Sequence, residues 1–135
     1  MELTKYIRRK SGEVRIGATL IGGSHPIAVQ SMTNTATADV EQSVAQVERI
    51  ADAGAPIVRL TAQGKREGEA LADIVAKVRE DGYSTAIVAD IHFVPEIASI
   101  AADSVDKVRI NPGNYRTSGG ELEALIEKCR KHAGS

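Results

Sequence analysis

Short apolar runs alternate along the chain with longer segments of helical period. Four runs rich in Val, Ile and Ala occupy residues 27–32, 57–61, 85–92 and 107–111. Each run is followed by turn residues and then by apolar positions three and four residues apart, as in an amphipathic helix. Parallel strands need such a crossover connection to reach the next strand. The pattern therefore predicts four βα units.

Polar and turn residues mark the ends of the predicted helices. Asp39, with Gln42 three residues later, is expected to cap the first helix, and Gly54 is expected to end it. The other predicted boundaries are a second helix ending near Gly82, a third starting at Pro95 and a fourth ending near Gly134.

Two short segments before the first strand, residues 13–17 and 19–21, predict a small β-hairpin that plugs one end of the sheet. The chain then divides into a lead-in over residues 1–26 and the βα units over residues 27–135. Four such units fit either a small doubly wound α/β sheet or half of a TIM-type (β/α)8 barrel, for which about 250 residues is typical. The positions of polar residues within the strands distinguish these two folds.

Polar residues share one parity on the predicted strands. Alternate residues of a barrel strand point inward, and functional side chains gather at the carboxyl ends. Arg59, Asp90, His92, Arg109 and Asn111 all fall on the inward parity. This arrangement favours the half-barrel, with one polar end.

The first strand and two loops complete the candidate site. Gln30 and Met32 point inward if Ile27, Val29 and Ser31 pack on helices. Asn34 follows the first strand and Asn114 follows the fourth, so both are expected to supply amides at the mouth of the barrel.

Arginines inside strands point to a particular chemistry. A buried guanidinium needs a carboxylate or a bound anion, and its planar fork suits phosphate or carboxylate oxygens. Arg59 and Arg109 therefore predict an anion site, unless Asp90 pairs with one of them as a structural bridge. Asp90 and His92 are expected to orient the arginines or move protons. Their Asp-x-His spacing alone does not supply enough ligands for a metal site.

Composition excludes several classes of function. The net charge is -1 with both signs interspersed, so neither nucleic acid nor a membrane surface is an expected partner. No apolar run approaches the ~20 residues of a membrane-spanning helix, and the polar start does not look like a signal peptide, so we expect a cytoplasmic location. The single cysteine, Cys129, lies on the apolar stripe of the fourth helix and is expected to be a core thiol. Alone it holds neither zinc nor an iron-sulfur cluster.

The same motifs resemble those of the 4-hydroxy-3-methylbut-2-enyl diphosphate synthases. The matching segments, in order, are residues 29–35 (VQSMTNT), 57–60 (IVRL), 89–93 (ADIHF) and 108–114 (VRINPGN). The resemblance implies an oxidoreductase of the non-mevalonate isoprenoid pathway that acts on CH or CH2 groups. In that family the barrel binds 2-C-methyl-D-erythritol 2,4-cyclodiphosphate. A 4Fe-4S cluster in a separate carboxy-terminal domain passes on two electrons from flavodoxin or ferredoxin, opening the ring and removing a hydroxyl.

The resemblance also implies roles for the candidate residues. Arg59 and Arg109 would hold the diphosphate, and Asp90 and His92 would line the pocket as the catalytic candidates. The complete substrate-binding set is Gln30, Asn34, Arg59, Arg109, Asn111 and Asn114. No metal ligand is expected in this chain, because the cluster-binding cysteines and the iron-sulfur domain are absent from it.

We therefore expect the chain to be a fragment of such an enzyme, inactive alone. Two alternatives remain open at this point. One is a pterin-binding barrel of the dihydropteroate synthase type, and the other is a non-catalytic half-barrel that serves as an assembly module. A half-barrel exposes strand edges, so pairing into a homodimer is also expected.

Overall fold

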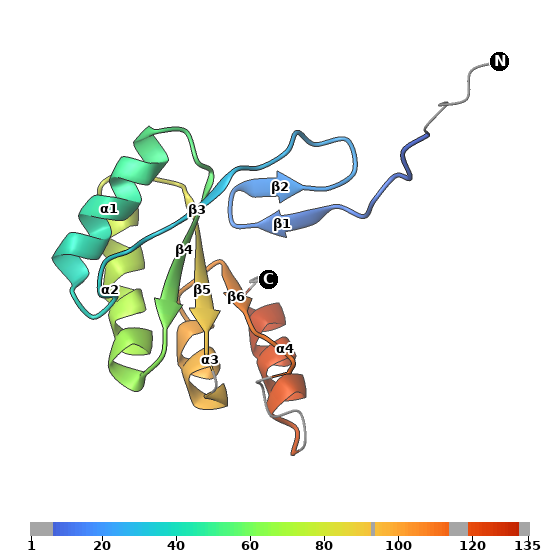
Figure 1. Ribbon diagram of the computed structural model, residues 1–135. Coiled ribbons are helices and arrows are strands. Elements are labelled where there is room, and N and C mark those ends of the chain that lie inside the picture. Colours follow the sequence, from blue (N-terminus) through green and yellow to red (C-terminus); the bar gives the residue numbers. More distant parts are fainter. Residues whose placement is uncertain (1–6, 93, 114–118, 133–135) are drawn as a thin grey trace.

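The computed structural model describes residues 7–92, 94–113 and 119–132, and it places four parallel strands in one sheet. The strands are β3 (Gln30–Met32), β4 (Ile57–Ala62), β5 (Ala86–Ile91) and β6 (Lys107–Arg109). Each strand pairs with the next one along the chain, in the order β3-β4-β5-β6 (Figure 1). A doubly wound sheet reverses its strand order at a switch point, whereas a barrel does not. The four βα units predicted from the sequence are confirmed.

The helices begin and end close to the predicted residues. They are α1 (Val40–Asp52), α2 (Lys65–Glu80), α3 (Pro95–Ala101) and α4 (Glu121–Lys131). The Asp39 side chain accepts a hydrogen bond from the Gln42 backbone N–H at 3.2 Å, which confirms the predicted cap of α1. The predicted end of α4 near Gly134 lies outside the described residues.

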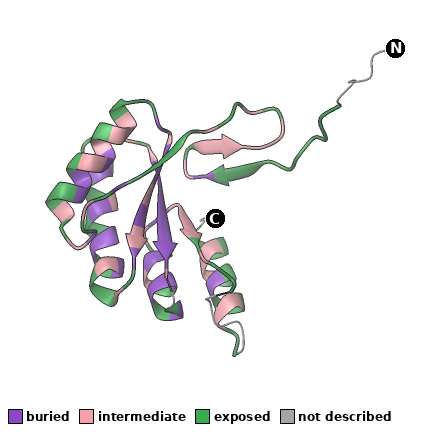
Figure 2. Cartoon of the chain, in the orientation of Figure 1, coloured by how far each residue is buried: buried purple, intermediate pink, exposed green. Residues whose placement is uncertain are grey.

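The main core lies between the helices and one face of the sheet. Side chains of one parity on β4 and β5 are buried against the helices. Figure 2 shows β5 as the most completely buried strand. The strand residues of that parity are Val58, Leu60, Ala62, Ile87, Ala89 and Ile91. The opposite parity is thereby left for the inner face, as the alternation along the strands predicts. Among the described residues, no helix is long and apolar enough to span a bilayer.

A small hairpin covers the inner face where the parallel strands begin. Strands β1 (Val14–Ile16) and β2 (Thr19–Ile21) pair antiparallel. Ile16, which is 1% exposed, packs in a second cluster with Ile57, Ala86 and Val88. The Thr19 hydroxyl adds a hydrogen bond of 3.3 Å to the Pro56 carbonyl, at the start of β4. The hairpin therefore plugs the amino end of the sheet, as predicted.

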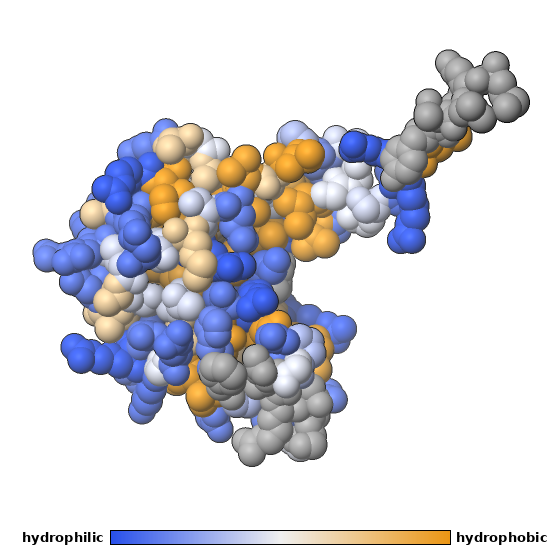
Figure 3. Space-filling model, viewed as in Figure 1, coloured by the Kyte–Doolittle hydropathy of each residue, from blue (hydrophilic) through white to orange (hydrophobic). Residues whose placement is uncertain are grey.

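The first parallel strand differs from its prediction. β3 covers only three residues, and the three residues expected to pack on helices are exposed: Ile27 by 91%, Val29 by 61%, and Ser31. That expectation is wrong because α1 packs mainly on β4 and α2. Figure 3 shows hydrophobic surface gathered over the region of the hairpin.

Candidate functional site

The strand register brings the inward polar residues to one level of the sheet. Thr61 on β4 aligns with Asp90 on β5, which aligns with Arg109 on β6. Arg59 lies one layer closer to the hairpin, opposite Met32 on β3. The carboxyl ends of three neighbouring strands therefore share one cluster of charged side chains, the strand-end cluster of Arg59, Asp90, His92 and Arg109.

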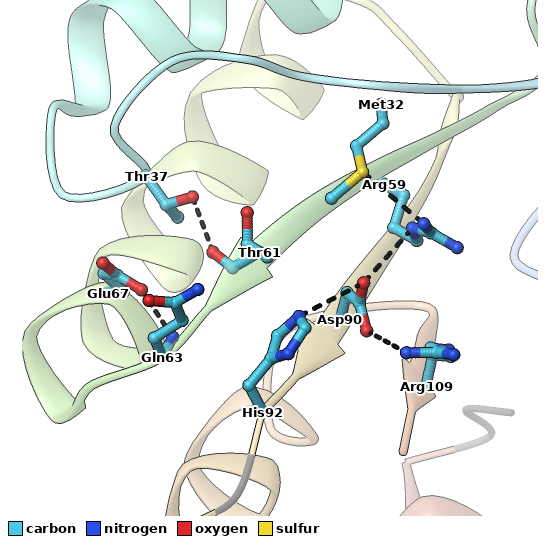
Figure 4. A network of polar contacts seen from close by, with 9 residues as sticks. All are labelled: Met32, Thr37, Arg59, Thr61, Gln63, Glu67, Asp90, His92 and Arg109. Atoms are coloured by element: carbon cyan, nitrogen blue, oxygen red, sulfur yellow. Dashed lines mark hydrogen bonds and ion pairs between the residues drawn. The ribbon is translucent and has the colours of Figure 1, made fainter. Parts of the chain in front are cut away.

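Asp90 is the centre of this cluster (Figure 4). Its Oδ1 accepts a hydrogen bond of 2.9 Å from Arg109 Nη1. Its Oδ2 lies 3.5 Å from Arg59 Nε and 3.6 Å from His92 Nε2. The Asp90 side chain is only 4% exposed, whereas those of Arg59 and Arg109 are 29% and 43% exposed. Asp90 thus contacts both arginines rather than forming a bridge with one of them.

Arg59 uses few of its hydrogen-bond donors. Its Nη2 faces the Met32 sulfur at 3.5 Å, and sulfur is a weak acceptor. Its Nε is buried without a hydrogen bond, since the 3.5 Å approach to Asp90 is an ionic contact. Within the described part of the chain, no oxygen accepts a hydrogen bond from Arg59. A guanidinium held in place with donors to spare suits a phosphate or a carboxylate.

The strand-end cluster also carries excess positive charge. One carboxylate faces two guanidiniums, so at least one positive charge is not neutralised. Lys107, which aligns with Val88, adds another positive charge on the inward parity. It forms no ion pair among the described residues. The surroundings therefore favour an anion.

The other predicted site residues lie apart from this cluster. Gln30 aligns with Ile57, four residues before Thr61, so it lies about 13 Å along the strand direction from the level of Asp90. Asn34 turns toward α1: its backbone N–H donates to Gln46 Oε1 at 2.7 Å, and its Oδ1 accepts from Gln46 Nε2 at 2.6 Å.

The amides after β6 are only partly described. Asn111 Oδ1 accepts a hydrogen bond of 3.0 Å from the Gly113 backbone N–H, which fixes the local turn. Asn114 lies outside the described residues. Of the eight candidates, the structure brings Arg59, Asp90, His92 and Arg109 into contact.

Two contacts near the site are not evident from the residue pattern. Met32 contacts Arg59 from β3, and its alignment with Arg59 is the signal that identifies it. The Thr37 hydroxyl donates a hydrogen bond of 2.6 Å to the Thr61 carbonyl, which holds the loop after β3 against the end of β4. Hydroxyls in that loop therefore support its shape.

The chain itself does not fit an iron-sulfur cluster. No group of three or more His, Cys, Asp or Glu side chains that could hold a metal ion occurs in the described ranges. Cys129 is half-buried and packs against the main core, where burial raises the pKa of its thiol. A cluster needs several thiolates, whereas the sequence has one cysteine.

The fold and the site together define a class of protein. In-order parallel βα units, with charged inward residues at their carboxyl ends, define a segment of a TIM-type barrel. Residues 11–135 match the GcpE TIM-barrel domain, and the chain belongs to that family. This confirms the resemblance found in the motifs and favours it over the pterin-binding alternative.

Similar proteins carry one enzyme name. The 4-hydroxy-3-methylbut-2-en-1-yl diphosphate synthase (flavodoxin) of Phocaeicola vulgatus is 54% identical over 125 residues, covering 93% of this chain and 20% of that protein. The enzyme of the same name from Parabacteroides distasonis is 53% identical over 141 residues, covering 97% of this chain and 23% of that protein. The chloroplastic 4-hydroxy-3-methylbut-2-en-1-yl diphosphate synthase (ferredoxin) of Arabidopsis thaliana is 38% identical over 151 residues, covering 96% of this chain and 20% of that protein. The chain spans about a fifth of the length of these relatives.

Proposed function

We propose that this chain is the part of a 4-hydroxy-3-methylbut-2-enyl diphosphate synthase that binds the substrate diphosphate. The observation that carries the proposal is the placement of Arg59 and Arg109 on either side of Asp90 at the strand ends. Membership of the GcpE TIM-barrel family and the shared name of the relatives support it. The substrate in this proposal is 2-C-methyl-D-erythritol 2,4-cyclodiphosphate, which the enzyme reduces in isoprenoid biosynthesis.

In this proposal the two guanidiniums bind the diphosphate oxygens through charge-assisted hydrogen bonds. Arg59 and Arg109 keep donors that Asp90 does not use, and these donors face the strand ends. We also propose the amides of Asn111 and Asn114 as groups that bind the diphosphate. Gln30 and Asn34 are weaker candidates, because Gln30 lies far from Asp90 and Asn34 is occupied by Gln46. His92, whose Nε2 lies 3.6 Å from Asp90 Oδ2, is the group we propose for proton transfer with the bound substrate.

The electrons in this proposal come from outside the chain. The names of the relatives specify flavodoxin or ferredoxin, so we take a small redox protein of that kind as the donor. A 4Fe-4S cluster supplies the reducing chemistry, and it is held by another part of the enzyme because the present residues do not fit it. This chain contributes binding and orientation. Pairing with a second copy through the sheet edges is a separate prediction, and sedimentation showing only monomer would contradict it.

Calorimetric titration of the cyclic diphosphate into the chain tests the proposal. Arg109→Ala is expected to raise the dissociation constant at least tenfold, since a charged hydrogen bond contributes about 1.5–3 kcal/mol. Arg130→Ala, which removes the same charge from an exposed position on α4, is the matched control and should leave affinity within twofold. Equal affinities of wild type and Arg109→Ala would refute the diphosphate site. Preferential binding of a pterin would refute the choice of substrate.

A further inference from the structure

We propose that Asp90 is a positioning residue, which fixes the two arginines for an anion without binding the substrate itself. This inference rests on the proposed function, in that it takes an anion to bind at the strand-end cluster. In this inference the Asp90 carboxylate does not contact the substrate. Its role is to orient the guanidiniums that do.

The contacts of Asp90 divide between its two oxygens. Oδ1 accepts from Arg109 on β6, and Oδ2 faces Arg59 on β4, while Asp90 itself stands on the strand between them. Neighbouring strands lie about 4.8 Å apart, so the two strands that carry the arginines are nearly 10 Å apart. A central carboxylate is the one group in the cluster that draws both guanidiniums toward a common point. His92 Nε2, 3.6 Å from the same Oδ2, is oriented by it as well.

Burial indicates that Asp90 is not itself the anion's partner. Its side chain is 4% exposed, whereas those of Arg59 and Arg109 are 29% and 43% exposed, so a ligand contacts the arginines more readily than it contacts Asp90. A carboxylate also repels a diphosphate. Its presence at the centre of an anion site is therefore explained by what it does to the arginines.

The two effects of Asp90 predict opposite results when its charge is removed. By electrostatics alone, Asp90→Asn would strengthen anion binding, because one negative charge leaves the site. By positioning, the variant weakens binding, because two long and flexible side chains lose the group that orders them before the ligand arrives. The positioning effect is expected to prevail, since a neutral amide has a single acceptor oxygen and no charge, and so cannot attract one guanidinium to each of two oxygens as the carboxylate does.

The experiment titrates inorganic pyrophosphate into the full chain by calorimetry at several salt concentrations. We expect Asp90→Asn to bind at least fivefold more weakly than wild type at every salt concentration. Asp103→Asn removes the same charge from the exposed ion pair between Asp103 and Lys128, so it serves as the matched control and should stay within twofold. Unchanged or tighter binding by Asp90→Asn would overturn the inference.

A second measurement separates positioning from general damage to the fold. In nitrogen-15 NMR spectra of the unliganded chain, the Nε–H signal of Arg59, whose Nε is buried 3.5 Å from Asp90 Oδ2, is expected to be protected from exchange in wild type. In Asp90→Asn it should exchange rapidly, while backbone amides of the main core keep their shifts. Loss of the core signals would show a structural role and overturn the inference.

The Arg109→Ala variant distinguishes failure of the inference from failure of the proposed function. If wild type does not bind pyrophosphate, or Arg109→Ala binds it as tightly, the anion site and the inference fall together. If Arg109→Ala weakens binding and Asp90→Asn does not, the anion site stands and only the positioning role of Asp90 is refuted.

Discussion

Removal of the Asp106 carboxylate tests how the amino end of the sheet supports the site. Asp106 directly precedes β6, three residues before Arg109. Its Oδ2 accepts hydrogen bonds from Arg79 Nη2 at 2.7 Å and from the Ile87 backbone N–H at 2.8 Å. Arg79 in turn donates to the carbonyls of Tyr83 and Thr85. One carboxylate therefore joins the end of α2, the start of β5 and the start of β6.

The magnitude follows from these two contacts. Asp106→Ala leaves the N–H of Ile87, which is fully buried, without an acceptor, at a cost of about 1–3 kcal/mol. The lost ion pair adds about 1 kcal/mol, a value discounted because the Arg79 and Asp106 side chains are 34% and 22% exposed. We expect a loss of about 2–4 kcal/mol in the free energy of unfolding. Asp106→Asn keeps an acceptor for Ile87 and should lose only about 1 kcal/mol.

Urea unfolding followed by circular dichroism measures both variants. Asp103→Ala, which removes an exposed carboxylate that pairs with Lys128, is the control and should change stability by less than about 1 kcal/mol. If Asp106→Ala unfolds within about 1 kcal/mol of wild type, the buried N–H has found another partner and the reasoning fails. If Asp106→Asn and Asp106→Ala lower the free energy of unfolding equally, the hydrogen bond to the Ile87 N–H is not the larger of the two contributions.

Three further predictions concern other parts of the chain. Gly17→Ala should destabilise the fold by about 1–3 kcal/mol in urea unfolding, because φ is +56° and a Cβ would lie 2.9 Å from Asp106 Cγ; an unchanged midpoint would contradict this. Interaction with the Asp81 carboxyl raises the pKa of Glu48 and lowers the pKa of Asp81, so the stability that Glu48 contributes is full at low pH and is lost as pH rises through its folded pKa. Glu48→Gln keeps a donor at every pH. In urea unfolding from roughly pH 4 to 8, its stability relative to wild type should therefore increase as pH rises, and a constant difference in the free energy of unfolding would refute the pairing. Since burial raises the pKa of Cys129, its thiol should react with a disulfide reagent near pH 8 more slowly than a free cysteine peptide, and equal rates would show an accessible thiolate.

Sequence reasoning predicted the face of the sheet on which each strand residue lies, because that depends only on counting. Arg59 and Arg109 share a parity with Asp90, and the structure places all three on one face. The cap at Asp39 was equally local, since it needs only the next turn of helix. Features set within a few residues were therefore predictable.

The position of each residue along the strand axis, relative to the neighbouring strands, could not be predicted by counting residues. Gln30 shares the inward parity, yet register places it about 13 Å from the level of Asp90, and register depends on how each helix packs. The exposure of Ile27 and Val29 has the same origin, because it is decided by where α1 lies. The pairing of Asn34 with Gln46 joins a loop to a helix face, which the residue pattern does not reveal.

The hairpin plug has a kinetic consequence for any ligand at the strand ends. Ile16 packs on the inner face against Ile57 and Val88, so the hairpin covers the amino end of the sheet. In a barrel plugged at that end, a ligand at the arginines would enter and leave at the carboxyl end of the strands. Arrival and departure then compete for one route, and a product that keeps the same anionic group would delay the next substrate.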